Sequence, residues 1–340
     1  MIRGVVVSAA VLCAASFVTG ASAEDFYAGK QMTIVVSSES GSGYDLYARS
    51  IARWLPKRLA LNPSVIVQNM PGASGLRASN YLYNVAPKDG LTIGLVNNGN
   101  PFAALYGMTQ AQFDPVKFNW LGSPTKETSV FLLWHTIPVN SLAEAKKREL
   151  ILGSAGNATG GAFYSRILTA VFGLKIKNIA GYKGMAEALL AMERGENEGY
   201  ASTFWSTLQS TKADWIRDKK MKFLLRYSGD VQPGLEGVPL AEDLTTNQDD
   251  KILLQLVAAP FTLGRPMLAP PGVPADRVAI LKKAIYDTFI DADFRGDCDR
   301  QNLDCSSPSS GNEIAALIAK TYTAPVAVKK RLLDLYQAEQ

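Results

Sequence analysis

The side chains that acid–base or nucleophilic catalysis needs are scarce in this sequence. His135 is the only histidine, so a Ser-His-Asp or Cys-His arrangement would depend on it alone. It follows the apolar run 131–134, which favours a structural histidine over a general base. Neither a Gly-x-Ser-x-Gly elbow nor a Gly-x-x-x-x-Gly-Lys-Ser/Thr loop occurs. The residue types therefore predict no enzyme, no metal site and no bound cofactor.

A loop of small residues offers a different chemistry. Residues 37–45 read Ser-Ser-Glu-Ser-Gly-Ser-Gly-Tyr-Asp, between a β-branched run at 32–36 and an amphipathic helix pattern. A strand, a small-residue turn and a helix N-terminus together present N–H groups and a partial positive charge to an anion. A dinucleotide site would need glycine where Leu46 stands. An ordinary tight turn between strand and helix is the alternative interpretation.

Three further loops of this kind follow strand patterns, at 69–75, 97–101 and 154–161. In an open α/β sheet, ligands bind beyond the carboxyl ends of the strands. Four such loops would bring together many neutral hydrogen-bond donors. Because no pair of acidic residues accompanies them, the loops predict a site for an anionic ligand.

Strand and helix patterns alternate along the chain. Apolar runs predict strands at 32–36, 65–67, 91–96 and 150–152, and residues at helical spacing predict helices over 47–55, 163–171, 185–192 and 278–289. Pro56 should end or kink the first helix. The alternation predicts an α/β fold with largely parallel sheets. Polar, turn-rich stretches at 123–129 and 228–250 are candidates for crossings between two lobes.

Length and composition agree with a two-domain globular protein. The chain has 340 residues, of which 47% are hydrophobic and 19% charged, with a net charge of +4. No basic stripe occurs, which argues against a nucleic-acid partner. Residues 1–23 combine Arg3, an apolar run and Ala-Ser-Ala at 21–23, which predicts a cleaved export signal. An uncleaved membrane anchor is the alternative.

Two cysteines remain after the expected cleavage. Cys298 and Cys305 lie seven residues apart, and an even pair in an exported protein predicts a disulfide that closes a small loop. Two free thiols are the alternative. The pair is a poor zinc motif, because structural zinc requires four ligands.

Six short motifs, taken together, resemble a known family: the periplasmic solute-binding proteins of the tripartite tricarboxylate transporters, or Bug proteins. They are Gly-Ser-Gly-Tyr-Asp at 41–45, Asn-Met-Pro-Gly-Ala-Ser-Gly at 69–75, Pro-Lys-Asp-Gly at 87–90, Asp-Pro-Val-Lys-Phe at 114–118, Tyr-Lys-Gly at 182–184 and Ala-Pro-Pro-Gly-Val-Pro at 269–274. They run in family order over nearly the whole expected mature chain. Departures at 37–40, 77–78 and 201–205 leave the ligand open.

The resemblance implies a type II, two-lobed "Venus flytrap" periplasmic binding protein, each lobe a sheet flanked by helices. By analogy, residues 24–124 plus 256–340 form lobe 1 and residues 125–255 form lobe 2. It also implies ligand contacts from both lobes, at Ser37, Ser38, Ser40, Gly43, Tyr44, Asp45, Ala73, Ser74, Asn97, Ser154, Asn157, Thr159, Gly160, Tyr182 and Thr203. Asp45 is expected to orient the loop rather than touch an anion, because like charges repel.

The implied function is capture of a small organic carboxylate in the periplasm and its delivery to membrane permease subunits, by a monomer. Two alternatives stay open: a secreted α/β enzyme using His135 or a loop serine, and a ligand-sensing partner of a membrane kinase. Aromatic residues near the loops, Tyr44, Phe102, Phe204 and Trp205, would favour an aromatic or medium-chain acid if they line the cleft. Alternatively, Phe102, Phe204 and Trp205 pack into their own lobes.

Overall fold

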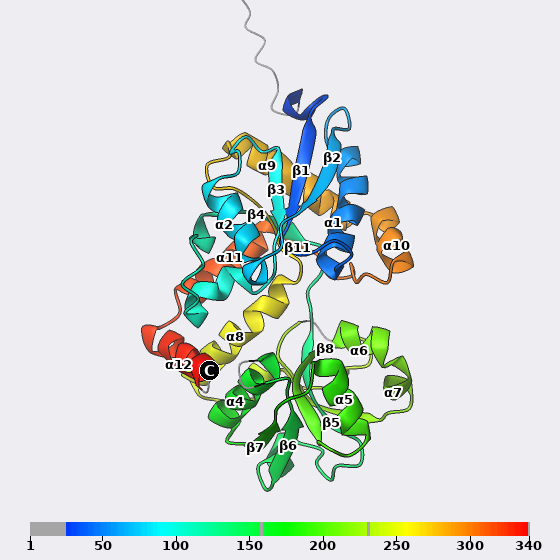
Figure 1. The fold of residues 1–340 in the computed structure, drawn as a ribbon, viewed down its shortest axis with the longest axis vertical. Helices are drawn as coiled ribbons and strands as arrows, with labels where there is room; N and C mark the ends of the chain where they lie inside the picture. The colour runs from blue at the N-terminus through cyan, green and yellow to red at the C-terminus, as the bar shows by residue number, and fades with distance from the viewer. Residues whose placement is uncertain (1–24, 157–158, 230–231, 339–340) are drawn as a thin grey trace, which may run out of the picture.

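The computed structural model describes residues 25–156, 159–229 and 232–338. The predicted export signal lies outside these residues. Figure 1 shows two sheets, each flanked by helices, one in the upper and one in the lower half of the view. Within the described residues, no helix combines the length and the apolar character needed to cross a bilayer.

The first sheet has six strands in the order β11-β4-β10-β3-β1-β2. Their bounds are β1 Gln31–Val36, β2 Ser64–Asn69, β3 Thr92–Leu95, β4 Asn119–Ser123, β10 Met267–Ala269 and β11 Ser309–Ser310. β1 lies parallel to β2 and β3. The strands predicted at 32–36, 65–67 and 91–96 are therefore confirmed, each within a few residues of its predicted ends.

The second sheet has five strands in the order β7-β6-β8-β5-β9. They are β5 Ser129–Trp134, β6 Glu149–Gly153, β7 Lys175–Ile179, β8 Gly199–Phe204 and β9 Met221–Arg226. The expectation of largely parallel sheets is wrong, because β5 and β10 pair antiparallel with both of their neighbours. Each of these strands enters its sheet directly after the chain crosses from the other lobe. Each therefore runs away from the crossing, whereas the strands paired beside it run toward it.

The helices cover the faces of the two sheets. Their bounds are α1 Gly43–Trp54, α2 Leu76–Asn84, α3 Leu142–Ala145, α4 Gly160–Phe172, α5 Met185–Glu193, α6 Trp205–Thr211, α7 Ala213–Arg217, α8 Gln248–Leu263, α9 Ala275–Phe289, α10 Ala292–Arg300, α11 Gly311–Tyr322 and α12 Val326–Gln337. Short 3-10 turns add η1 Asp25–Tyr27, η2 Leu55–Arg58, η3 Ala73–Gly75, η4 Asn100–Tyr106, η5 Pro115–Lys117 and η6 Ala241–Leu244. The four predicted helices are confirmed as α1, α4, α5 and α9, and α1 gives way to a 3-10 turn at Pro56, as expected.

Two segments carry the chain between the sheets. Residues 124–128 connect β4 to β5, and α8 runs back from the second lobe toward β10, through the centre of Figure 1. α12 contributes the buried Val328 and Leu332 to the apolar core that contains Phe163 of α4 and Val257 of α8. The limits of the two lobes stay a prediction. By those limits α12 belongs to lobe 1, but it packs with this second-lobe core.

The two remaining cysteines are joined. Cys298 in α10 and Cys305 form a disulfide with 6.2 Å between their Cα atoms, which confirms the predicted pairing. Within the loop that it closes, the Asp304 carbonyl accepts a 2.7 Å hydrogen bond from Tyr47 Oη. The Asp304 carboxylate accepts a 2.9 Å bond from Thr125 Oγ1. The disulfide loop is thus fastened to both α1 and the first crossing segment.

Candidate functional site

The first small-residue loop is organised around Asp45. Ser42 caps α1, and the buried Asp45 carboxylate accepts hydrogen bonds from Gly41 N at 2.8 Å, Asn69 Nδ2 at 2.9 Å and Arg49 Nε at 2.9 Å. Asn69 also donates to the Ser38 carbonyl at 3.1 Å. The carboxylate therefore holds the 37–45 loop against the end of β2.

Burial alone would raise the pKa of Asp45. The hydrogen bonds from Arg49, Gly41 and Asn69 outweigh it, so the pKa falls from 3.8 to about 2. The group is ionised at neutral pH, and its charge is taken up by donors of the protein itself.

The second and third loops meet the first. Ala73 and Ser74 have positive φ values of 47° and 53°, and Gly75 one of 90°. A Cβ at Gly75 would lie 2.9 Å from Asn100 Nδ2 and 3.1 Å from Ser37 Cβ. Glycine is required here because the backbone has a left-handed conformation and passes directly against two neighbours. The close approach brings the 72–75 turn onto Ser37.

Tyr44 links the third loop to the second crossing. Its Oη accepts a 3.0 Å hydrogen bond from Asn98 N, while Asn98 Nδ2 donates to the Pro260 carbonyl in α8 at 2.8 Å. The Arg265 guanidinium lies 4.6 Å from the Tyr44 ring centroid. The Asn97 side chain accepts from Gly99 N at 2.9 Å and so shapes its own turn. Ser38 shares a 2.6 Å hydrogen bond with Ser42, whereas Ser40 and Gly43 are exposed.

The second-lobe residues lie at the carboxyl ends of β6, β7 and β8. Thr159 is the N-cap of α4, its Oγ1 donates to the Gly156 carbonyl at 2.6 Å, and Gly160 begins the helix. The Tyr182 ring lies against Gly153 at the end of β6. Thr203 is buried, with its hydroxyl 2.7 Å from Met185 Sδ. Asn157, the remaining predicted contact, lies outside the described residues.

One serine in each lobe stands out. Ser37 directly follows β1, and Ser154 directly follows β6, so the two occupy equivalent positions in their sheets. Ser37 is 5% exposed and Ser154 is fully buried, and neither Oγ has a hydrogen-bond partner in the part of the chain that the structure describes. Leaving a buried hydroxyl without a partner costs about 1–3 kcal/mol. Both hydroxyls are therefore expected to bond to something other than these protein atoms.

Phe102, Phe204 and Trp205 do not line a cleft in the way that an aromatic ligand would need. Phe102 is 1% exposed and packs in the first-lobe core, and Trp205 is 2% exposed, with its ring edge-on to Phe223 at 5.4 Å. The half-buried Phe204 packs edge-on to Phe261 at 5.4 Å. These rings pack into the protein interior, as in the alternative interpretation.

His135 has no place near these loops. It follows the end of β5 that is distant from the first crossing, and its side chain is exposed beside the Trp134 ring, 5.1 Å away. The apolar run 131–134 favoured a structural histidine, but the buried residues end at Trp134 and His135 itself is exposed. The loop serines lie near the other end of β5, so His135 is too far away to act as a base for them.

An ion pair at the crossings was missed by the sequence analysis. Arg265 Nη2 lies 3.1 Å from Glu127 Oε1, and Ser206 Oγ donates to Glu127 Oε2 at 2.8 Å. These side chains, with Gly43 and Tyr47, line a cavity of about 440 Å³ between the lobes. Burial alone would lower the pKa of Arg265. The neighbouring Tyr44 and Glu127 raise it by more, so the pKa lies above its ordinary value and the guanidinium stays charged. The partners lie 138 residues apart, and no motif links them.

Comparisons with known proteins identify the family and the fold of this chain. A family model described as "Tripartite tricarboxylate transporter family receptor" matches residues 47–331. A curated UPF0065 protein of Agrobacterium vitis, from the TAR-I ttuE-ttuC' intergenic region, is 28% identical over 205 residues. That match covers 58% of this chain and 57% of the relative, so it spans a little over half of the relative's length.

Solved structures share the fold. A TctC solute-binding protein from Polaromonas, without ligand, is 20% identical with a TM-score of 0.72, covering 91% of this chain and 99% of that one. Rpa4515 of R. palustris with adipate is 18% identical with a TM-score of 0.57, covering 90% and 97%. MatC from Rhodopseudomonas palustris with bound malate is 20% identical with a TM-score of 0.55, covering 91% and 99%. The family match spans most of the sequence and confirms the resemblance, so this chain belongs to the tripartite tricarboxylate transporter receptor family.

Proposed function

We propose that this chain is an exported receptor that binds a small organic carboxylate between its two lobes. It then presents that ligand to the membrane subunits of a tripartite transporter. The proposal includes cleavage of residues 1–23, a periplasmic location and a monomeric receptor. The six sequence motifs, the family match and the two-sheet fold support it together.

The observation that carries the proposal is the pair Ser37 and Ser154. Each is a buried hydroxyl at the carboxyl end of a strand, and neither has a partner among the described residues. A ligand carboxylate supplies the acceptor that such hydroxyls lack. Because one serine belongs to each sheet, a dicarboxylate with one group on each serine would hold the two lobes together. The remaining loop residues predicted from the sequence complete the proposed site.

The electrostatics of the loops favour an anion held by neutral donors. Asp45 is the buried acidic residue of the first loop, and its charge is satisfied by Arg49 and two amide groups. The N-terminus of α4 at Gly160 adds a partial positive charge. With Phe102 and Trp205 in the lobe interiors, we favour an aliphatic acid over an aromatic one. The malate and adipate held by two structures of the same fold support this class.

Isothermal titration of the exported protein with mono-, di- and tricarboxylates tests the proposal. At least one aliphatic dicarboxylate should bind. Ser37→Ala and Ser154→Ala should each weaken it by about 1.5–3 kcal/mol, the contribution of a hydrogen bond to a charged group. Neither change should lower the free energy of unfolding, because the lost hydroxyl had no described partner. Ser64→Ala, at an exposed position, is the matched control. Binding of amines or neutral sugars with no response to any carboxylate would contradict the proposal.

A further inference from the structure

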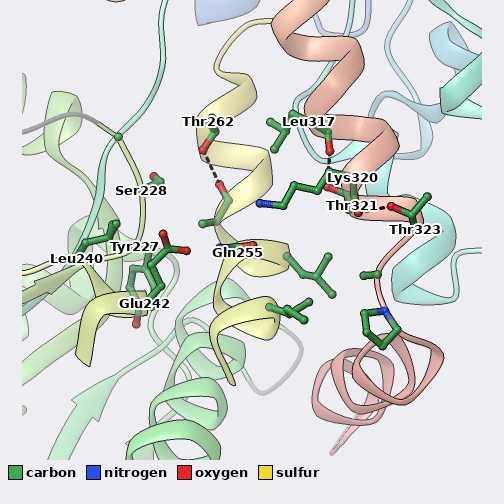
Figure 2. Close-up of a pocket in the computed structure, with 16 residues that line it drawn as sticks. Tyr227, Ser228, Leu240, Glu242, Gln255, Thr262, Leu317, Lys320, Thr321 and Thr323 are labelled. Atoms are coloured by element: carbon green, nitrogen blue, oxygen red, sulfur yellow. Dashed lines mark hydrogen bonds between the residues drawn. The ribbon is translucent and has the colours of Figure 1, made fainter. Parts of the chain in front are cut away.

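A second cavity, of about 420 Å³, lies beside the crossing helix α8 (Figure 2). Its walls come from three parts of the chain: residues 227–229 with Leu240 and Glu242 after β9, α8 itself, and α11 with the turn that follows it. None of its lining residues belongs to the loops of the proposed carboxylate site. On α8, Gln255 and Thr262 face the cavity, whereas Val257 and Phe261 pack into the second-lobe core. It is therefore a separate cavity, in contact with both lobes.

The hydroxyl groups of the lining are already used by the protein. Thr321 Oγ1 donates to the Leu317 carbonyl at 2.8 Å, and Thr323 Oγ1 donates to the Ala319 carbonyl at 3.1 Å. Ser228 Oγ donates to the Glu127 carbonyl at 3.0 Å. The rest of the wall is largely aliphatic, from Leu240, Ile252, Leu256, Leu317, Ala324 and Pro325. Most of the surface offered to a ligand is thus apolar.

Two charged groups complete the lining, one from each side. Glu242 belongs to η6 on the second-lobe side, and Lys320 belongs to α11 on the first-lobe side. Figure 2 shows the Lys320 side chain reaching across the cavity, Glu242 on the opposite wall and Gln255 between them. Neither charge lies within 4.0 Å of an opposite charge in the described ranges. An acid and a base therefore face the cavity from opposite walls, with the Gln255 amide and aliphatic side chains lining the space around them.

We propose that this cavity binds a small zwitterion with an apolar middle, such as an ω-amino acid. The ligand's ammonium group lies against Glu242, its carboxylate lies against Lys320, and its methylene chain covers the aliphatic part of the wall. The volume falls in the range of small-molecule sites. Such a ligand would bridge the two lobes at a place distinct from the carboxylate cleft.

Saturation-transfer NMR with γ-aminobutyrate, ε-aminocaproate and ω-aminocaprylate tests this site on the full exported chain. One chain length should bind more tightly than the others, and caproate and hexylamine, which each lack one charged end, should bind more weakly than ε-aminocaproate. Glu242→Gln and Lys320→Gln should each weaken the zwitterion about two- to fivefold, the effect of losing one partly exposed charge pair. The exposed Glu193→Gln and Lys146→Gln are matched controls and should change nothing.

The double exchange Glu242→Lys with Lys320→Glu provides the decisive result. It should restore zwitterion binding, because the ligand can bind in the reverse direction. Binding should also persist in Ser37→Ala and Ser154→Ala, which separates this site from the carboxylate cleft. Loss of zwitterion binding in those serine variants, equal binding of caproate, or no effect of the two Gln variants would overturn the proposal.

Discussion

Asp45→Asn should destabilise the protein at neutral pH, and the difference should disappear in acid. The carboxylate accepts three hydrogen bonds, and the pKa of Asp45 falls from 3.8 to about 2. A shift of that size corresponds to about 2 kcal/mol, at roughly 1.4 kcal/mol for each pKa unit. Because the folded pKa is the lower one, this stability is complete above the unfolded pKa near 4 and is lost as pH falls through about 2.

Urea unfolding, followed by tryptophan fluorescence between about pH 7 and pH 2.5, measures this difference. The free energies of unfolding of the wild type and Asp45→Asn should differ by about 2 kcal/mol at neutral pH, and the difference should shrink progressively as pH falls from about 4 toward 2. Asp287→Asn, which removes an exposed pair with Lys283, should cost about 0.5 kcal/mol or less at any pH and is the control. A constant gap across the pH range would refute the assignment of the stability to the Asp45 charge.

Three further predictions concern the contacts that join distant parts of the chain. Glu127→Gln or Arg265→Gln alone should lower the free energy of unfolding by roughly 2–3 kcal/mol. In a double-mutant cycle measured by urea unfolding, the double variant should lose less than the sum of the two single losses, and strict additivity would argue against the ion pair. Replacing Cys298 and Cys305 by serine should cost about 2 kcal/mol, because the closed loop is short; unreduced mass spectrometry of the wild type should show no free thiol at either position. Leu332→Ala should cost about 2–5 kcal/mol, because the side chain is fully buried against α4 and α8; a loss below about 1 kcal/mol would mean that α12 adds little to this core.

The parts of the fold that depend on local patterns could be predicted from the sequence. The runs at 32–36 and 65–67 form strands because their β-branched residues pack within a sheet, and Gly173 ends α4 because it adopts a positive φ of 69°. The contact between Ser37 and the 72–75 turn could be predicted only in general terms, because loops gather at the carboxyl ends of parallel strands. That rule does not give contacts between particular atoms.

Other features depend on tertiary contacts that no local pattern contains. Glu127 and Arg265 are brought together only by the two crossings. Trp205 illustrates a different limit, because an aromatic residue after a strand can face either a cleft or a core. Here α6 begins at Trp205 itself, so no loop separates the ring from the sheet, and the ring packs inward. The polar stretch at 228–250 was a candidate for the return crossing, but α8 makes that crossing. Its apolar faces pack on both lobes, so the crossing has no polar linker pattern.

The disulfide loop has a practical consequence for how the receptor is produced. Asp304, inside that loop, accepts hydrogen bonds from Tyr47 and Thr125, and Asp299, Asn302 and Asp304 line the cavity between the lobes. Protein purified from a reducing cytosol would carry Cys298 and Cys305 as thiols, and hydrogen bonds and core packing would hold this wall without the covalent link. Ligand affinities measured on such a preparation describe a receptor with one looser wall, and they should be compared with those of exported, oxidised material before either is assigned to the native protein.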